Sequence, residues 1–163
     1  MRIAITQTVH APPEKAIAAY STPAFFDGRP TLDDITVVEV VSHDATSVPI
    51  LMEVRFAFQG NVSSAVRAVV DPSKMTWVTR TEIHPGEGRS SWKVLPDHYP
   101  DRLSAHGTYT FEPGPEPGTT HITIQGELKV HMPLVGRTVE RVIVSGLTKY
   151  IEAEVASIPD LGR

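Results

Sequence analysis

The sequence contains no cysteine, which excludes disulfide bonds, thiolate metal sites and cysteine nucleophiles. It also lacks any run of about 18 apolar residues, the length a helix needs to cross a membrane. Basic residues are in the minority, with 15 Lys and Arg against 19 Asp and Glu. The resulting net charge of −4 argues against nucleic acid or an anionic membrane surface as a partner.

The length of 163 residues corresponds to one domain, and no internal repeat or low-complexity tract interrupts it. A chain of this size buries roughly 70% of its unfolded surface, so a full core is available. The first seven residues alternate between polar and apolar, unlike the continuous apolar stretch of a signal peptide. We therefore expect a single domain over residues 1–163 and a cytoplasmic location.

Several segments alternate polar and apolar residues, a period of two that is typical of antiparallel strands with one wet face. The clearest are residues 50–58, 103–111 and 121–132, and residues 3–9 alternate in the same way. Weaker strand candidates are residues 35–41, 75–83 and 90–94. Proline and glycine dominate residues 113–118, which predicts a hairpin loop between two of these strands.

Two short helices are predicted after the first strand. Pro12 and Pro13 suit a first helical turn, so one helix begins near residue 11 and ends near residue 22. Residues 24–28 predict a second short helical turn that carries exposed aromatic rings. Residues 61–70 are interpreted as a further short helix.

The C-terminal segment has a different period. From residue 134 to residue 158, apolar side chains recur at spacings of three and four, which defines one stripe along a helix. Such a helix would be about 38 Å long at 1.5 Å per residue. Glu152 and Glu154 are assigned to its solvated face, off the stripe. One long helix needs one curved apolar sheet face to bury that stripe, so the expected fold class is α+β.

This order of elements resembles the START-like superfamily, also called SRPBCC, over nearly the whole chain. Residues 11–16 (APPEKA) are similar to the start of the first helix in that superfamily, and residues 130–140 (VHMPLVGRTVE) to the start of the last helix in a bacterial subfamily. The resemblance implies a helix-grip fold, in which a seven-stranded curved antiparallel sheet wraps around the C-terminal helix and encloses a cavity. Birch-pollen-allergen-like and polyketide cyclase-like members bind lipids, sterols, hormones or polyketides, and others activate a chaperone ATPase. The fold is therefore implied more closely than the function.

Glycines on the inward faces are the most informative residues. Gly107 and Gly126 lie in the middle of apolar strand faces, and Gly146 lies near the helix stripe. Glycine inside a strand or helix loses packing and order, so its presence calls for a reason. One reason is a close approach of two backbones or a bend in the sheet. The other is missing side-chain volume that leaves a cavity, and three such glycines on facing surfaces favour the cavity.

We expect the walls of that cavity to be apolar and aromatic with a few polar points, as in small-molecule pockets. Tyr109 and Tyr150 would supply hydroxyl groups, and Phe25 and Phe26 would form part of the mouth. The predicted ligand-binding residues are Phe25, Phe26, Phe56, Phe58, Trp77, Trp92, Gly107, Tyr109, Gly126, Leu128, Val139, Ile143, Gly146, Leu147 and Tyr150.

The seven histidines do not have the spacing of metal ligands. No two of them stand at i, i+3 or i, i+4 on a predicted helix, and His121 and His131 would be about 33 Å apart along one strand. The Gly-x-Ser-x-Gly motif of a nucleophile elbow is absent as well. We therefore assign no metal site, no catalytic residue and no cofactor.

The leading hypothesis is a binding protein for a small hydrophobic ligand, such as a lipid or a polyketide, held under the C-terminal helix. Two alternatives stay open: a polyketide cyclase- or aromatase-like enzyme, and an interaction module similar to the co-chaperone branch. The enzyme would need a titratable group inside the cavity, and no inward-facing His, Asp or Glu is identified. The sequence leaves the identity of the ligand, any protein partner and the oligomeric state open.

Overall fold

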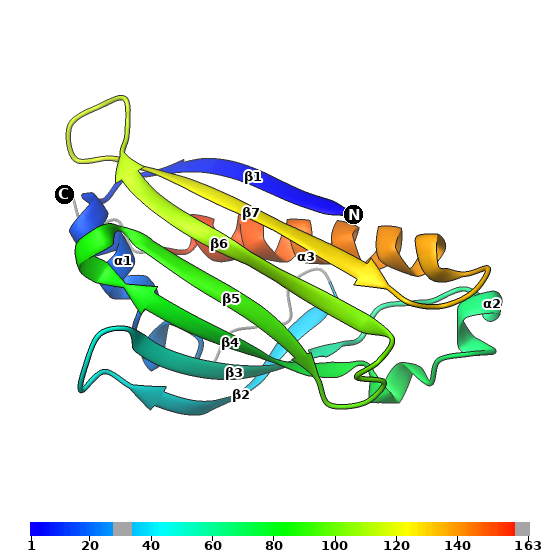
Figure 1. Cartoon of the computed structure of the whole chain (residues 1–163). Coiled ribbons are helices and arrows are strands. Elements are labelled where there is room, and N and C mark those ends of the chain that lie inside the picture. Colours follow the sequence, from blue (N-terminus) through cyan, green and yellow to red (C-terminus); the bar gives the residue numbers. More distant parts are fainter. Residues whose placement is uncertain (28–33, 159–163) are drawn as a thin grey trace.

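A computed structural model of the chain describes residues 1–27 and 34–158, in which one curved sheet wraps around a long helix (Figure 1). The strands are β1 (Arg2–Val9), β2 (Ile35–Asp44), β3 (Ile50–Phe58), β4 (Thr76–His84), β5 (Arg89–Pro96), β6 (Leu103–Pro113) and β7 (Thr120–Val130). The α-helices are α1 (Pro13–Tyr20), α2 (Ser64–Arg67) and α3 (Gly136–Ala156), and single 3-10 turns are η1 (Pro23–Phe25), η2 (Pro72–Lys74) and η3 (Pro85–Glu87).

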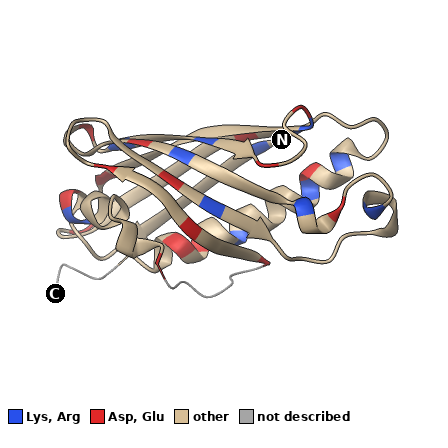
Figure 2. Ribbon diagram, turned by 90° about the horizontal axis from the view of Figure 1, so that it is seen from below, with Lys and Arg blue, Asp and Glu red and all other residues tan. Residues whose placement is uncertain are grey.

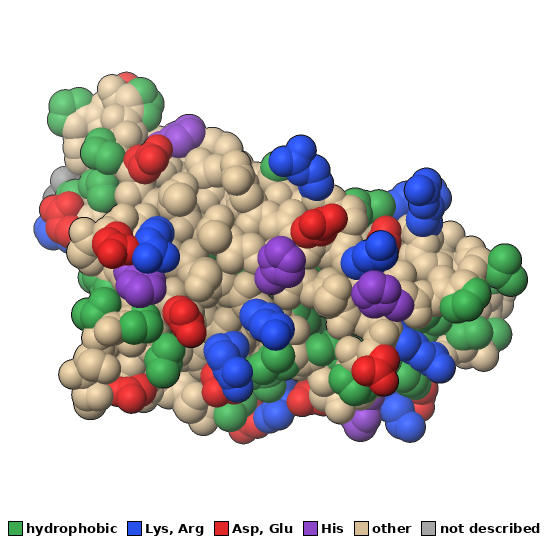
Figure 3. Space-filling model, in the orientation of Figure 1, with side chains coloured by type: hydrophobic (Ala, Val, Ile, Leu, Met, Phe, Trp, Pro, Cys, Tyr) green, Lys and Arg blue, Asp and Glu red, His purple; other side chains and the backbone are tan. Residues whose placement is uncertain are grey.

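The strand order is β1-β7-β6-β5-β4-β3-β2, and every neighbouring pair is antiparallel. Alternation places one set of side chains on the concave face, where Met52, Val54 and Phe56 of β3 are buried. The intervening residues of β3 are more exposed and point outward. Figure 2 shows basic and acidic residues interspersed along the strands. Figure 3 shows the same mixture, with histidines among the charges, on one face of the molecule. These findings confirm the seven-stranded antiparallel sheet.

Helix α3 lies against the concave face of the sheet, with contacts to β1, β7 and β2 (Figure 1). Val139, Tyr150, Ile151 and Val155 are its buried hydrophobic side chains. The helix is unbroken and falls within the predicted segment 134–158. Its arrangement with the sheet confirms the α+β class and the helix-grip fold.

Two local predictions need correction. The helix expected at residues 61–70 is only the single turn α2, which begins where the Ser63 hydroxyl accepts a hydrogen bond from the Val66 N–H. The aromatic rings expected to be exposed are not: Phe26 is 5% exposed, and Phe25 is half-buried. Both rings pack edge-on against Tyr20, which removes them from solvent. Gly28, the end of that predicted turn, lies outside the described residues.

Candidate functional site

Two adjoining cavities lie between α3 and the sheet. One, which we call the outer cavity, has a volume of about 80 Å³, and the other, the inner cavity, has a volume of about 60 Å³. The residues that line both of them are Ile35, Trp77, Val94 and Leu147. Because the two cavities share these walls, one molecule could occupy both.

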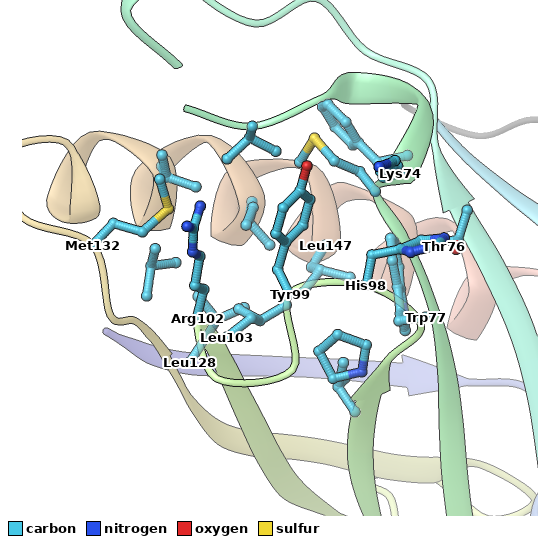
Figure 4. Close-up of a pocket in the computed structure, with 18 of the residues that line it drawn as sticks. Lys74, Thr76, Trp77, His98, Tyr99, Arg102, Leu103, Leu128, Met132 and Leu147 are labelled. Atoms are coloured by element: carbon cyan, nitrogen blue, oxygen red, sulfur yellow. The ribbon is translucent and has the colours of Figure 1, made fainter. Parts of the chain in front are cut away.

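The outer cavity is walled by apolar side chains and opens among loops. Its floor and walls come from α3 and from strands β2 to β7, and its rim comes from the segments before β4 and between β5 and β6 (Figure 4). The apolar residues that line it are Ile35, Phe58, Val70, Met75, Trp77, Val94, Pro96, Leu103, Leu128, Val130, Met132, Val139, Ile143 and Leu147. Its basic residues, Lys74, His98 and Arg102, are all exposed at the rim.

The inner cavity contains a buried carboxyl group. Glu154, on the last turn of α3, is 4% exposed, and the Tyr109 hydroxyl of β6 donates a hydrogen bond to its Oε1 over 3.3 Å. The ring of Tyr20, from α1, stacks on the ring of Tyr109 with 5.0 Å between the centroids. Thr79 and Thr81 of β4 line the same space. The inner cavity therefore combines this carboxyl with several hydroxyl-bearing side chains inside an otherwise apolar wall.

Burial sets the protonation state of the two stacked tyrosines. It raises the pKa of both the Tyr20 and Tyr109 hydroxyls, because ionised phenolate is poorly solvated there. The charge of Glu154 raises both pKa values further, since a second negative charge nearby is disfavoured. Both hydroxyls thus stay protonated at neutral pH and can donate hydrogen bonds.

The buried position of Glu154 overturns its assignment to the solvated face. The residue follows Ile151 by three positions and Tyr150 by four, so the helical period places it on their side of α3. A curved sheet also buries a wider arc of the helix than the apolar stripe alone indicates. The spacing of Glu154 from Ile151 and Tyr150 is a signal in the sequence that predicts burial. The assignment to the solvated face followed the charge of the residue instead.

Most of the predicted site residues meet around these cavities. Phe58, Leu128, Val139 and Ile143 line the outer cavity, and Trp77 and Leu147 line both. The predicted residues in the inner cavity are Phe26, Phe56, Trp92, Tyr109 and Tyr150. Phe26 therefore contributes to the inner wall rather than to a mouth. Phe25 lines neither cavity and packs on Tyr20. Sequence reasoning missed Glu154 and the rim residues Lys74, Tyr99 and Arg102.

The void expected beside Gly107 and Gly126 is filled by a tryptophan ring. The two glycines are paired across β6 and β7, and Trp92 of β5 lies over them. A Cβ atom on Gly126 would be 2.6 Å from the Trp92 ring and 2.6 Å from the His106 carbonyl oxygen. The prediction that these glycines leave an empty volume is therefore wrong, because they make room for the indole.

Gly146 is also separate from the two cavities. It lines a hollow of about 340 Å³ with Asp34, Phe58, Asn61 and Lys149, among others. Because Gly146 does not face Gly107 or Gly126, the three glycines do not form one surface.

Metal-binding clusters and membrane spans are both absent from the described residues. Within residues 1–27 and 34–158, no three His, Asp or Glu side chains are grouped so that they could hold a metal ion. None of the described helices combines the length and the apolarity required to span a bilayer.

Comparison with known sequences assigns the family. Residues 4–160 match the family described as "Protein of unknown function (DUF2505)". The chain belongs to the DUF2505 family. No curated protein matches this sequence.

Solved structures show the same fold for this DUF2505 protein. TTHA0849 from Thermus thermophilus is 16% identical with a TM-score of 0.66, and the match covers 95% of this chain and 94% of that one. The Zhui aromatase/cyclase from Streptomyces sp. R1128 is 12% identical with a TM-score of 0.61, covering 95% and 91%. A START superfamily protein from Mycobacterium smegmatis is 16% identical with a TM-score of 0.51, covering 94% and 96%. The DUF2505 chain therefore has the START-like fold.

Proposed function

We propose that this protein binds a small, mainly apolar molecule in the inner and outer cavities. The observation that supports this function is the pair of adjoining cavities between α3 and the sheet, with apolar walls and few polar groups. The outer cavity opens among loops, so part of a bound molecule can extend beyond the enclosed volume. The START-like fold, which other proteins of known structure share, is consistent with a ligand-binding role.

Uptake of the fluorescent probe N-phenyl-1-naphthylamine tests this function. Leu147 lines both cavities, so Leu147→Phe should fill the shared space and weaken probe binding about tenfold or more. The matched control is Leu134→Phe, because Leu134 is fully exposed just before α3 and lines neither cavity. Absence of probe uptake by the parent, or equal effects of the two variants, would contradict the proposal.

A second candidate function is acid–base catalysis on a carbonyl compound bound in the inner cavity. The observation in its favour is Glu154, the titratable carboxyl that a cyclase-like enzyme requires, beside the protonated hydroxyls of Tyr20 and Tyr109. In this reaction the Glu154 carboxylate takes a proton from the carbon next to the carbonyl. The electron pair of the broken C–H bond moves to the carbonyl oxygen, which a tyrosine hydroxyl stabilises by a hydrogen bond. The protonated Glu154 then exchanges its proton with solvent and returns a solvent-derived proton to the same carbon, which completes the cycle.

Hydrogen–deuterium exchange of 2-tetralone in D₂O, followed by NMR, tests this candidate. The protein should accelerate exchange at the carbon next to the carbonyl, and Glu154→Gln should remove most of the acceleration. Leu147→Phe should also reduce it if the reaction takes place in the cavity. Exchange at the uncatalysed rate with the parent protein, under conditions in which the ketone binds, would leave binding as the function.

A further inference from the structure

Three basic side chains gather at the rim of the outer cavity. We propose that Lys74, His98 and Arg102 bind the anionic group of an amphipathic ligand whose apolar part occupies the cavity. This inference rests on the proposed binding function and narrows the class of ligand. Figure 4 shows Tyr99 standing between Arg102 on one side and Lys74 on the other.

The distribution of charge around this cavity supports an anionic ligand. The whole chain has an excess of acidic residues, with 19 Asp and Glu against 15 Lys and Arg. Among the described residues that line the outer cavity, however, every charged or titratable side chain except the Tyr99 phenol is basic, and none is Asp or Glu. An apolar body would therefore meet hydrophobic walls, and its charged end would meet cations at the rim.

The three rim residues are also not neutralised by ion pairs. Within the described part of the chain, no carboxylate oxygen lies within 4.0 Å of a side-chain nitrogen of Lys74, His98 or Arg102, whereas Arg55, Arg80 and Arg89 all form such pairs. Asp71 and Asp97, two acidic residues near the rim, hydrogen-bond chiefly to other residues, although the charge of Lys74 also acts on the Asp71 carboxylate. The Asp71 carboxylate accepts hydrogen bonds from Ser73 and the Asp97 carboxylate from Arg55 and Thr76.

Contacts between two loops hold Arg102 at the rim. Its Nη1 donates a hydrogen bond to the Val69 carbonyl oxygen over 3.1 Å, and its guanidinium carbon lies 5.2 Å from the centre of the Tyr99 ring. The Tyr99 hydroxyl in turn accepts a hydrogen bond from the Asp71 N–H over 3.2 Å. A guanidinium has five N–H donors, and only one of them is used in this contact. The others can meet an oxyanion, which Arg binds in two-point geometry.

The basic residues at the rim and the apolar walls below them fit a ligand with a small oxyanion at one end and an apolar remainder. Either a carboxylate, as in a fatty acid, or a phosphate ester would meet that description. Both groups accept charge-assisted hydrogen bonds from Arg and Lys. Displacement of a bound probe by decanoate and by decyl phosphate distinguishes these two sources.

The test compares two fluorescent probes with the same aromatic skeleton. 1-Anilinonaphthalene-8-sulfonate carries an anionic group, and N-phenyl-1-naphthylamine does not. The variants Lys74→Gln and Arg102→Gln should together weaken binding of the sulfonate about three- to tenfold and leave the neutral probe unchanged. The matched control is Lys93→Gln, which removes the same charge from an exposed position on β5 that lines neither cavity. High salt should reduce the affinity for the sulfonate in the parent, because it screens exposed charges.

The outcomes separate this inference from the function on which it rests. Equal changes for both probes, no change for either, or the same effect from Lys93→Gln would overturn the anionic site while leaving apolar binding intact. The single variant Lys74→Gln separates the loss of charge from a disturbance of the loops. It keeps the hydrogen bond from Arg102 to the Val69 carbonyl oxygen, which holds the two loops together. Failure of the parent protein to take up either probe would overturn both the site and the proposed function.

Discussion

The hydroxyl of Tyr109 lies 3.3 Å from Oε1 of Glu154 and connects β6 to α3 inside the molecule, although 45 residues separate the two positions. Glu154 is 4% exposed and Tyr109 is also 4% exposed, so this contact is shielded from water. A buried carboxyl group requires polar neighbours, because burying it without hydrogen-bond partners lowers the stability of the folded state far more than leaving it exposed to water. The contact therefore links the stability of the core to the chemistry of the inner cavity.

Removal of the Tyr109 hydroxyl should destabilise the protein. Tyr109→Phe deletes the donor to Glu154 and keeps the ring that stacks on Tyr20, so we expect a loss of about 1 kcal/mol in the free energy of unfolding. Urea titration measures this loss. Tyr99→Phe is the control, and a change within about 0.5 kcal/mol is expected there because that hydroxyl bonds at the surface. Equal losses in both variants would show that burial of the contact is unimportant.

Stability should fall at alkaline pH. The pKa values of Tyr20 and Tyr109 are raised in the folded state, so these groups hold their protons when unfolded tyrosine, with a pKa near 10, releases its own. Their contribution to the free energy of unfolding is fully present below about pH 10. It decreases as the pH rises above about 10, by about 1.4 kcal/mol per pH unit for each group.

Unfolding measurements between pH 9 and pH 11 test this dependence. Tyr109→Phe should have a shallower decline than the parent, since one of the two groups is gone. Tyrosinate absorbance gives an independent measurement, because Tyr20 and Tyr109 should ionise only as the protein unfolds. Ionisation of all 4 tyrosines near pH 10 in the folded protein would contradict the prediction.

A methyl group on Gly126 should disturb the packing of Trp92. Gly126→Ala would place its Cβ atom 2.6 Å from both the indole ring and the His106 carbonyl oxygen, so we expect a loss of about 1–3 kcal/mol. Gly86→Ala is the matched control, because no atom outside the immediate chain neighbours lies within 4 Å of a Cβ atom at that position. Denaturant unfolding and Trp fluorescence together measure the effect. An unchanged Gly126→Ala variant would mean that the indole is free to move away.

Loss of the Asp97 charge should lower the free energy of unfolding at neutral pH. Asp97 accepts two hydrogen bonds from Arg55, at 3.1 and 3.2 Å, and the pKa of its carboxyl is lowered chiefly by that partner. Its contribution is therefore present above the unfolded pKa near 4 and is lost as pH falls through the lowered folded value. Asp97→Asn should cost up to about 1 kcal/mol at pH 7, since the pair is partly exposed.

The comparison with pH 3 completes that experiment. The difference between Asp97→Asn and the parent should shrink there, because protonation removes the same charge from the parent. Asp101→Asn, at an exposed position near the same loop, should have little effect at either pH. A difference that persists unchanged at pH 3 would assign the effect to the side-chain shape rather than to the charge.

Parts of the site could be predicted from local pattern alone. The side chains of Phe56, Trp77 and Leu128 fall on the inward face of their strands by alternation, and each of them lines a cavity. Ile143 and Leu147 follow in the same way from the helical stripe. The residues at the rim of the outer cavity could not be predicted from periodicity, because Lys74 and Arg102 belong to segments without a repeating pattern of polar and apolar residues.

The sequence by itself determined the strands, the long C-terminal helix and their order, because periods of two and of three to four residues depend only on neighbouring positions in the chain. The START-like fold followed from that order and from the two helix-entry segments, 11–16 and 130–140. Only the tertiary structure decided what fills the space between the layers. It placed Trp92 over Gly126 and buried Glu154 beside Tyr109, since strand register and sheet curvature bring together residues that are distant in sequence.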